Sequence, residues 1–89
     1  MDRRKYIGVL SAIATHINLY GAISLDKAQK FLDTIDYGFD DSDDLIGMLY
    51  SYSFFSFGEL EEGIDQATGK TIIERTLPRN KYDCYNGNL

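Results

Sequence analysis

Apolar residues recur at intervals of three and four in the first part of the chain, which is the spacing of one face of an α-helix. Within residues 3–20 this seam consists of Tyr6, Val9, Leu10, Ile13, Ile17 and Tyr20. The spacing predicts a first helix from about Arg3 to Tyr20, and Gly21 is the expected stop because glycine readily ends helices. The next two residues, Ala22 and Ile23, could pair briefly as a strand.

A second apolar stripe begins after Ser24. A serine side chain accepts a hydrogen bond from the free N–H groups of a first turn, so Ser24 is predicted to cap a helix of about Leu25 to Ile35. The buried face of this helix is expected to consist of Leu25, Ala28, Phe31, Leu32 and Ile35. The sequence Asp36-Tyr37-Gly38 is expected to end the helix and to open a short acidic loop.

The third stretch runs from Leu45 to Gly58 without a single charged residue. One helical face carries Leu45, Met48, Leu49, Tyr52 and Phe55, and an adjoining face carries Ile46, Tyr50, Phe54 and Phe57. A helix that is apolar almost all round is largely buried, so we predict a central helix from about Asp43 to Phe54 or Phe55. Ser42, Asp43 and Asp44 have the composition of a helix start, with Ser42 as the predicted cap. The segment SYSFFSF at the far end is also compatible with a strand.

The pattern changes to alternation after Gly58. Residues 59–65 alternate with Leu60 and Ile64 on one side, Gln66 to Gly69 have turn chemistry, and Lys70 to Leu77 alternate again until Pro78. These features predict a β-hairpin with a four-residue loop. The predicted fold class is therefore α+β: three helices followed by a hairpin, in one domain over residues 1–89. Its core would span about residues 3–77, with a partly flexible tail over 78–89.

This order of elements resembles a winged helix-turn-helix domain over about residues 5–77. The resemblance rests on YGAISLDKAQKFLDTI as the second helix, SDDLIGMLYSYSFF as the recognition helix and ELEEGIDQATGKTIIERTL as the wing. It implies DNA binding, with the third helix in the major groove. Three helices over a hairpin would also suit another small α+β layer fold.

The charges are strongly segregated along the chain. The net charge is −5, yet residues 31–69 carry ten acidic residues and no basic one. Such a block repels duplex DNA and anionic membranes and attracts basic protein surfaces. The alternative interpretation is an ordinary solvated surface.

Direct reading of DNA is disfavoured because the residues at the expected contact surface are acidic. A reading helix needs Arg, Lys, Asn or Gln near its start. The chain instead has Asp40, Asp41, Asp43 and Asp44 there, and Glu59, Glu61, Glu62 and Asp65 on the predicted wing. The basic residues that could touch a phosphate backbone flank this surface: Arg3, Arg4, Lys5, Arg75, Arg79 and Lys81.

The chain has no motif that predicts catalysis, a metal or a cofactor. Residues 63–71 have five residues between their glycines, where a phosphate-binding loop needs four, and no start in the aspartate cluster fits a calcium loop. His16 and Cys84 are single, which is too few for zinc, and a Cys–His pair is disfavoured. The lone cysteine, the absence of a leader-like segment and the lack of a long apolar run lead us to expect a cytoplasmic protein.

The favoured hypothesis is a non-enzymatic inhibitor that binds a basic nucleic-acid-binding protein through an acidic face. In size, acidity and lack of catalytic groups the chain is similar to phage-encoded anti-CRISPR and anti-restriction proteins of the DNA-mimic type. The target would be a Cas effector, a restriction enzyme or another nuclease or DNA-binding protein. The candidate partner-binding residues are Asp36, Tyr37, Phe39, Asp40, Asp41, Asp43, Asp44, Tyr50, Glu59, Glu61, Glu62 and Asp65.

Two alternatives remain open from sequence. One is a winged-helix regulator from a phage or mobile element that binds DNA through its basic flanks or as a homodimer, with Ile46, Phe54 and Phe57 in the dimer interface. The other is an acidic protein-interaction adaptor.

Overall fold

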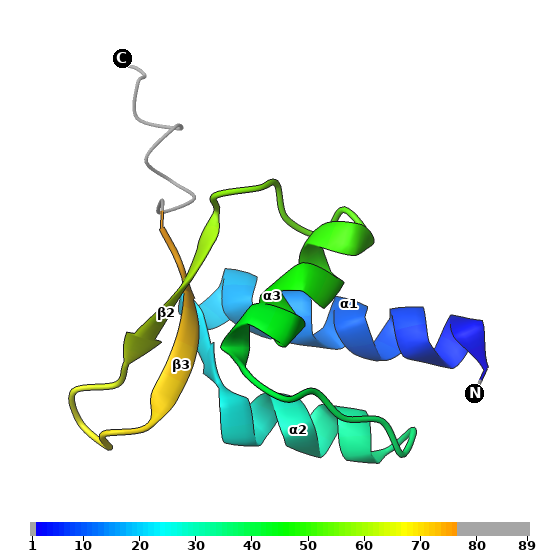
Figure 1. Cartoon of the computed structure of the whole chain (residues 1–89), viewed down its shortest axis with the longest axis horizontal. Coiled ribbons are helices and arrows are strands. Elements are labelled where there is room, and N and C mark those ends of the chain that lie inside the picture. Colours follow the sequence, from blue (N-terminus) through cyan, green and yellow to red (C-terminus); the bar gives the residue numbers. More distant parts are fainter. Residues whose placement is uncertain (1, 77–89) are drawn as a thin grey trace.

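Three helices and a three-stranded antiparallel sheet make up the described part of the chain (Figure 1). The structure is a computed structural model, and it describes residues 2–76. The elements in chain order are α1 (Arg3–Tyr20), β1 (Ala22–Ser24), α2 (Leu25–Asp33), α3 (Ser42–Ser51), β2 (Leu60–Ile64) and β3 (Thr71–Arg75). The predicted α+β class and its three helices are confirmed. Pro78 and the predicted tail over 78–89 lie outside the described residues.

The sheet has one more strand than the predicted hairpin. β2 and β3 form that hairpin, and Asp65 N donates to Lys70 O at 2.9 Å to close a loop over residues 66–69. β1 then pairs with the other side of β3, which gives the order β1-β3-β2. The brief strand after Gly21 is thus an integral edge of the sheet.

The first two helices begin where their caps predict. Asp2 caps α1, and Gly21 ends it in the left-handed conformation at φ 86°, which glycine adopts without strain. Ser24 caps α2 by accepting from Lys27 N at 3.1 Å. α2 ends at Asp33, two residues before the predicted Ile35, and turn bonds follow it.

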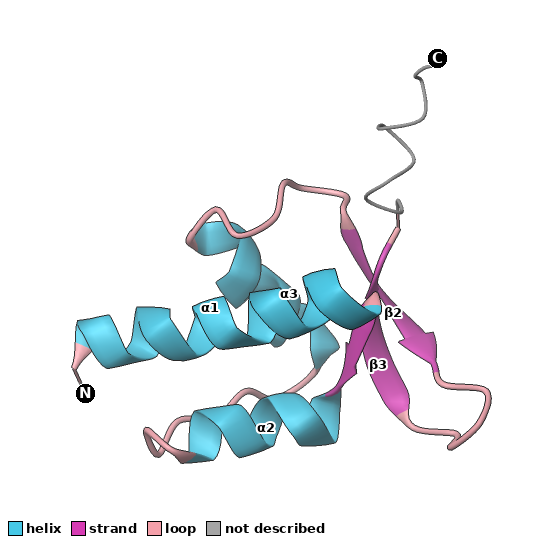
Figure 2. Cartoon of the chain, turned by 180° about the vertical axis from the view of Figure 1, so that it is seen from behind, coloured by secondary structure: helices cyan, strands magenta, loops and turns pink. Residues whose placement is uncertain are grey.

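One core joins the helices to one face of the sheet. In both views α1 and α2 lie along one another and the sheet stands across one end of them (Figures 1 and 2). The fully buried side chains of largest volume are Leu10, Ile13, Ile17, Ile23, Leu32, Leu45, Leu49 and Ile73. Burial of each such side chain contributes about 1.5–3 kcal/mol. Tyr20, predicted to continue the α1 seam, is instead exposed as the last residue of that helix.

α3 is shorter than its apolar sequence predicted. It ends at Ser51 rather than at Phe54 or Phe55, and Ser53 has a left-handed φ of 61°, which is incompatible with a continuing helix. Phe55 is nevertheless buried, but from the segment after α3. Ile64, expected beside Leu60 on the inner side of β2, is exposed near the hairpin loop, while Leu60 is buried.

Candidate functional site

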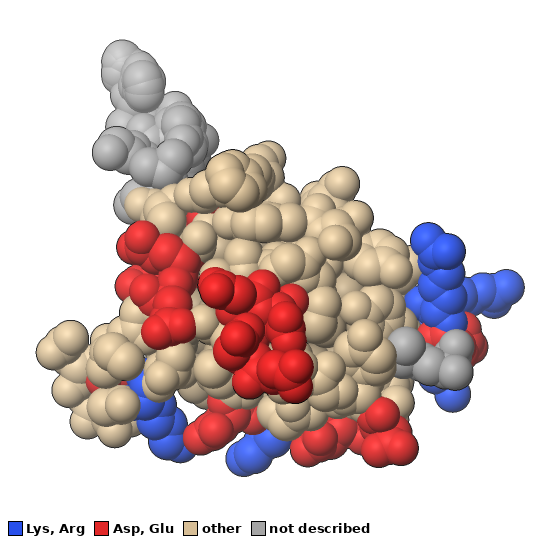
Figure 3. Space-filling view, viewed as in Figure 1, with Lys and Arg blue, Asp and Glu red and all other residues tan. Residues whose placement is uncertain are grey.

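Carboxylates gather on two neighbouring elements, the start of α3 and β2. The space-filling view shows two groups of acidic side chains side by side over these elements (Figure 3). Five exposed residues form what we call the acidic surface: Asp40, Asp41, Asp43, Asp44 and Glu62. The structure therefore brings together five of the twelve residues that the sequence suggested.

The aspartates at the start of α3 stabilise the N-terminal end of that helix through hydrogen bonds. Asp41 is the N-cap, and its Oδ1 accepts from Asp44 N at 3.0 Å. Asp44 in turn accepts from Asp40 N through Oδ2 at 3.0 Å. The prediction that Ser42 caps the helix was wrong. The carboxylates of Asp41 and Asp44 therefore satisfy two backbone N–H groups at the positive end of the helix dipole.

Ser42 instead connects α3 to β2. Its side chain is buried, at 3 % exposure, and its hydroxyl donates to Glu62 Oε1. Leu60 and Glu62 lie two positions apart on β2, so they share the face that meets the helices. This bond holds the carboxylate of Glu62 beside the four aspartates.

Glu61 lies on the other face of β2, where it is paired in register with Glu74 of β3. Two carboxylates directly opposite each other on a sheet repel. The acidic character thus continues round the edge of the sheet to Glu74. Sequence reasoning did not include Glu74 among the candidate acidic residues. The alternation of KTIIERTL places it on the face away from the helices once the register with β2 is known.

Glu59 and Asp65 lie apart from the acidic surface. The Oε1 atom of Glu59 accepts from Arg75 Nη2 at 2.7 Å, and the two side chains are only 27 % and 15 % exposed. Asp65 shapes the hairpin loop by accepting from Ala67 N at 2.9 Å. The charge of Glu59 therefore stabilises the fold through its ion pair with Arg75, and the carboxylate of Asp65 stabilises the hairpin loop.

Asp36, Tyr37 and Phe39 belong to the loop between α2 and α3, and the first two lie far from the acidic surface. Tyr37 packs edge-on against Tyr6 near the start of α1, with 5.0 Å between ring centroids. Burial, with Tyr37 nearby, raises the pKa of Tyr6 to about 12. The loop then runs back along α2 to the start of α3 beside the sheet (Figure 1). Phe39 is half-buried against the core.

Tyr50, a candidate partner-binding residue from sequence, uses its hydroxyl to hold the segment after α3. Its hydroxyl accepts from Gly58 N and Leu60 N, both at 3.1 Å, and donates to Leu60 O at 3.3 Å. Its ring lies 5.8 Å from that of Phe57, which is 94 % exposed. Sequence analysis assigned Phe57 to a helix face, but the helix ends before it.

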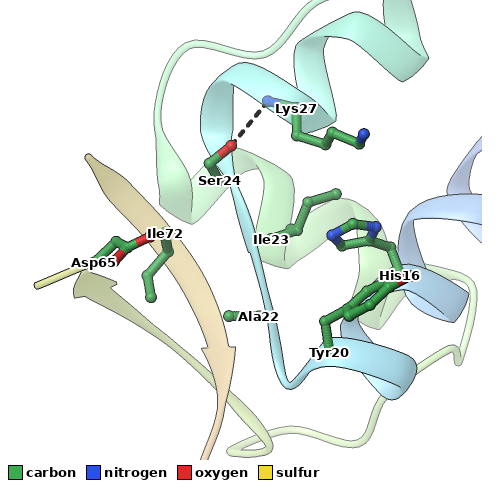
Figure 4. Close-up of a pocket in the computed structure, with 8 residues that line it drawn as sticks. All are labelled: His16, Tyr20, Ala22, Ile23, Ser24, Lys27, Asp65 and Ile72. Atoms are coloured by element: carbon green, nitrogen blue, oxygen red, sulfur yellow. Dashed lines mark hydrogen bonds between the residues drawn. The ribbon is translucent and has the colours of Figure 1, made fainter. Parts of the chain in front are cut away.

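A hollow of about 330 Å³ at the edge of β1 holds the only histidine of the chain. His16 and Tyr20 lie on one side of β1, and Asp65 and Ile72 lie on the other (Figure 4). Burial and the nearby Lys27 lower the pKa of His16. Ser24, the hydroxyl in this hollow, is engaged as the α2 cap. The hollow therefore offers no assembled nucleophile and base, and Cys84 lies outside the described residues.

The basic first turn of α1 is separated from the acidic surface, while other Lys or Arg side chains lie below the acidic groups in Figure 3. Arg3, Arg4 and Lys5 are exposed in the first turn of α1, at the end of the molecule away from the sheet (Figure 3). Arg75, considered from sequence as a DNA contact, is turned inward: its Nη1 donates to Asn18 Oδ1 at 2.5 Å, and it pairs with Glu59. Arg79 and Lys81 lie outside the described residues.

Over residues 2–76, no group of three or more His, Cys, Asp and Glu side chains is placed to hold a metal ion. Within the same range, no helix combines the length and the apolar character needed to cross a bilayer. No family model matches the chain, and no curated protein or solved structure matches it significantly.

Proposed function

We propose that this protein is a non-enzymatic inhibitor whose acidic surface occupies the nucleic-acid-binding groove of a basic protein. The target class is a nuclease or another DNA-binding effector, with Cas effectors and restriction enzymes as the leading candidates. The observation that carries the proposal is the concentration of exposed carboxylates at the start of α3 and on the adjacent β2.

The element order supports a winged-helix-like body for this role. α2 and α3 precede a β2–β3 hairpin, and β1 between α1 and α2 completes the sheet. In a helix-turn-helix domain the start of the third helix approaches DNA. Here that start carries Asp40, Asp41, Asp43 and Asp44, so the surface that would meet DNA has the charge of DNA.

The acidic surface presents several negative charges close together, as a nucleic acid does. Four carboxylates lie within residues 40–44, where Asp40 and the extended N-cap Asp41 precede the first turn of α3. Duplex DNA likewise carries closely spaced charges, about one phosphate per 1.7 Å of axis. A groove lined with Lys and Arg would therefore attract this surface, which favours rapid association.

The features that a DNA-binding regulator needs are not on this surface. α3 carries no basic residue, and Arg75 is largely buried in an ion pair. The exposed basic turn of α1 lies at the opposite end of the molecule (Figure 3). We therefore do not propose DNA binding as a second function.

The test compares two variants of equal charge. The first replaces Asp40, Asp41, Asp43 and Asp44 by Asn. The control replaces Asp2, Asp26, Asp33 and Asp36 by Asn, at sites away from the acidic surface. Asparagine keeps the caps at Asp2 and Asp41 and suits the left-handed Asp36. Both variants should therefore fold, which far-ultraviolet circular dichroism would check.

Each protein is immobilised and used to capture partners from host lysate with and without nuclease treatment, and the captured nuclease is assayed for inhibition. We expect the wild type and the control to retain and inhibit a nucleic-acid-binding protein, and the acidic-surface variant to lose both activities. Equal loss in both variants would show that net charge alone is responsible. Retention that disappears on nuclease treatment would contradict the proposal.

A further inference from the structure

Phe57 is the most exposed large apolar side chain among residues 2–76, at 94 %. It lies in the segment between α3 and β2, and among the described residues its ring meets that of Tyr50, at 5.8 Å between centroids. Single exposed apolar side chains are common on protein surfaces. Phe57 is informative because of how its segment is held and where it lies relative to the acidic surface.

The backbone on both sides of Phe57 is held by a dense set of hydrogen bonds. Tyr50 Oη accepts from Gly58 N, Thr76 Oγ1 donates to Gly58 O at 2.8 Å, and Thr76 N donates to Glu59 O at 2.8 Å. Ser56 N also donates to Glu59 Oε2 at 2.6 Å. The ring is therefore presented from a fixed support, and little conformational entropy would be lost when a partner covers it.

Phe57 follows the end of α3, and the aspartates of the acidic surface lie at the start of that helix. Ser42 at the start of α3 contacts Glu62, whereas Tyr50 near its end contacts Leu60, so α3 runs alongside β2. From Asp44 to Tyr50 is about 9 Å of helix rise. The surface above the acidic groups in Figure 3, over the end of α3 and the following segment, is uncharged.

We propose that Phe57 inserts into an apolar slot beside the basic groove of the partner, a slot that takes a nucleobase when nucleic acid is bound. This inference rests on the proposed function. A nucleic acid presents phosphates and flat bases together, and bases stack on aromatic or apolar platforms in such grooves. The carboxylates of the acidic surface correspond to the phosphates and the phenyl ring of Phe57 corresponds to a base. The two groups lie at opposite ends of α3.

A second copy of this chain is a poorer occupant. The surface area that one phenyl ring can bury is far smaller than the 1,200–2,000 Å² buried in a stable interface. Ile46 and Phe54, expected from sequence to extend a dimer face, are half-buried against the core. Pairing through Phe57 would also bring two acidic surfaces near each other, which repel. A basic partner with an apolar slot would instead neutralise the carboxylates and cover the ring of Phe57.

The experiment uses three purified DNA-free probes: a guide-loaded Cas effector, a restriction endonuclease and a helix-turn-helix repressor. Calorimetry measures the affinity of the wild type, Phe57→Ala, Phe57→Trp and the matched control Leu19→Ala between 50 and 300 mM salt. Leu19 is 71 % exposed at the end of α1, so both alanine variants remove an exposed apolar side chain. Neither substitution opens a cavity in the core.

For each probe that the wild type binds, we expect Phe57→Ala to lower the affinity at least tenfold without changing the salt slope. Phe57→Trp and Leu19→Ala should bind like the wild type. Unchanged affinity of Phe57→Ala, with the Asp→Asn acidic-surface variant still defective, would overturn this inference alone. Absence of wild-type binding to all three probes would overturn the proposed function with it. If the wild type formed a dimer that Phe57→Ala dissociated, this inference would be overturned, because the partner of Phe57 would then be a second copy of the chain.

Discussion

Asp41 has two roles at the start of α3. It caps the helix through Asp44 N, and its second oxygen adds a charge to the acidic surface. The two roles can be separated because Asn keeps the cap and removes the charge. Ser42, the expected cap, is used instead for the buried bond to Glu62.

Replacement of Asp41 by Ala should therefore lower the free energy of unfolding by about 1 kcal/mol, whereas Asp41→Asn should lower it by only a few tenths. Urea denaturation at neutral pH measures both. Asp43→Ala is the matched control, because Asp43 is exposed in the same turn and its side chain makes no hydrogen bond among the described residues. If Asp41→Ala and Asp43→Ala were equally stable, the cap assignment would be incorrect.

His16 makes stability depend on pH. Burial and the ammonium of Lys27 lower its pKa below the ordinary 6.5. The unfolded chain therefore binds a proton more readily than the folded chain as the pH falls through 6.5, and folded-state stability decreases over that window. We expect the unfolding free energy of the wild type to fall between pH 7.5 and 5.5 more steeply than that of His16→Gln. Parallel slopes for the two proteins would contradict this.

At the scale of elements, the acidic surface depends on contacts between α3 and the sheet. Ser42 with Glu62 and Tyr50 with Leu60 fix the two ends of α3 against β2. Arg75, the cross-strand partner of Leu60, fixes the end of β3 on the helix-facing side of the sheet. It contacts Asn18 of α1, Glu59 before β2 and the ring of Phe55, whose centroid is 5.2 Å away. These contacts determine where the carboxylates face.

Arg75→Ala should destabilise the protein by about 2–3 kcal/mol, because it leaves the partly buried Glu59 without its cation. Arg75→Lys should be intermediate, since an ammonium keeps the charge but cannot bond Asn18 and Glu59 in the planar fork geometry. Chemical denaturation of both variants tests this. In the Glu59→Gln background the cost of Arg75→Ala should shrink; an undiminished cost would mean that the pair is not the cause.

The sequence predicted those elements whose signals are local. Ser24 and Gly21 mark helix ends by their own chemistry, and the loop over 66–69 closes the hairpin as its turn residues indicate. The end of α3 could not be read in this way, because Tyr52, Phe54 and Phe55 are apolar in either a helix or a turn. Their burial is decided by packing, which periodicity does not encode.

The candidate site was predicted only in part for the same reason. The aspartates of residues 40–44 are neighbours in sequence, so their grouping was evident. The involvement of Glu62, the withdrawal of Glu59 to Arg75 and the separation of Asp36 and Tyr37 all depend on tertiary contacts. The exposure of Phe57 was missed because its spacing from Ile46, Tyr50 and Phe54 placed it on an apolar helical face.

At the scale of the whole molecule, charge is polarised. The basic first turn of α1 and the acidic surface lie at different ends of the described structure (Figure 3). Such a distribution orients the molecule as it approaches a charged partner, and this steering weakens as salt screens it. The account therefore requires that the acidic end face the partner and that nucleic acid compete for the same place.

The most direct test follows the anisotropy of fluorescent duplex DNA bound to the captured partner while the protein is added. Displacement predicts a fall to the value of free DNA, reached at higher protein concentration when Asp40, Asp41, Asp43 and Asp44 are Asn. The protein alone should leave the anisotropy of free DNA unchanged. A rise on addition to the complex, or binding to free DNA, would contradict the account because the acidic surface would then not exclude nucleic acid.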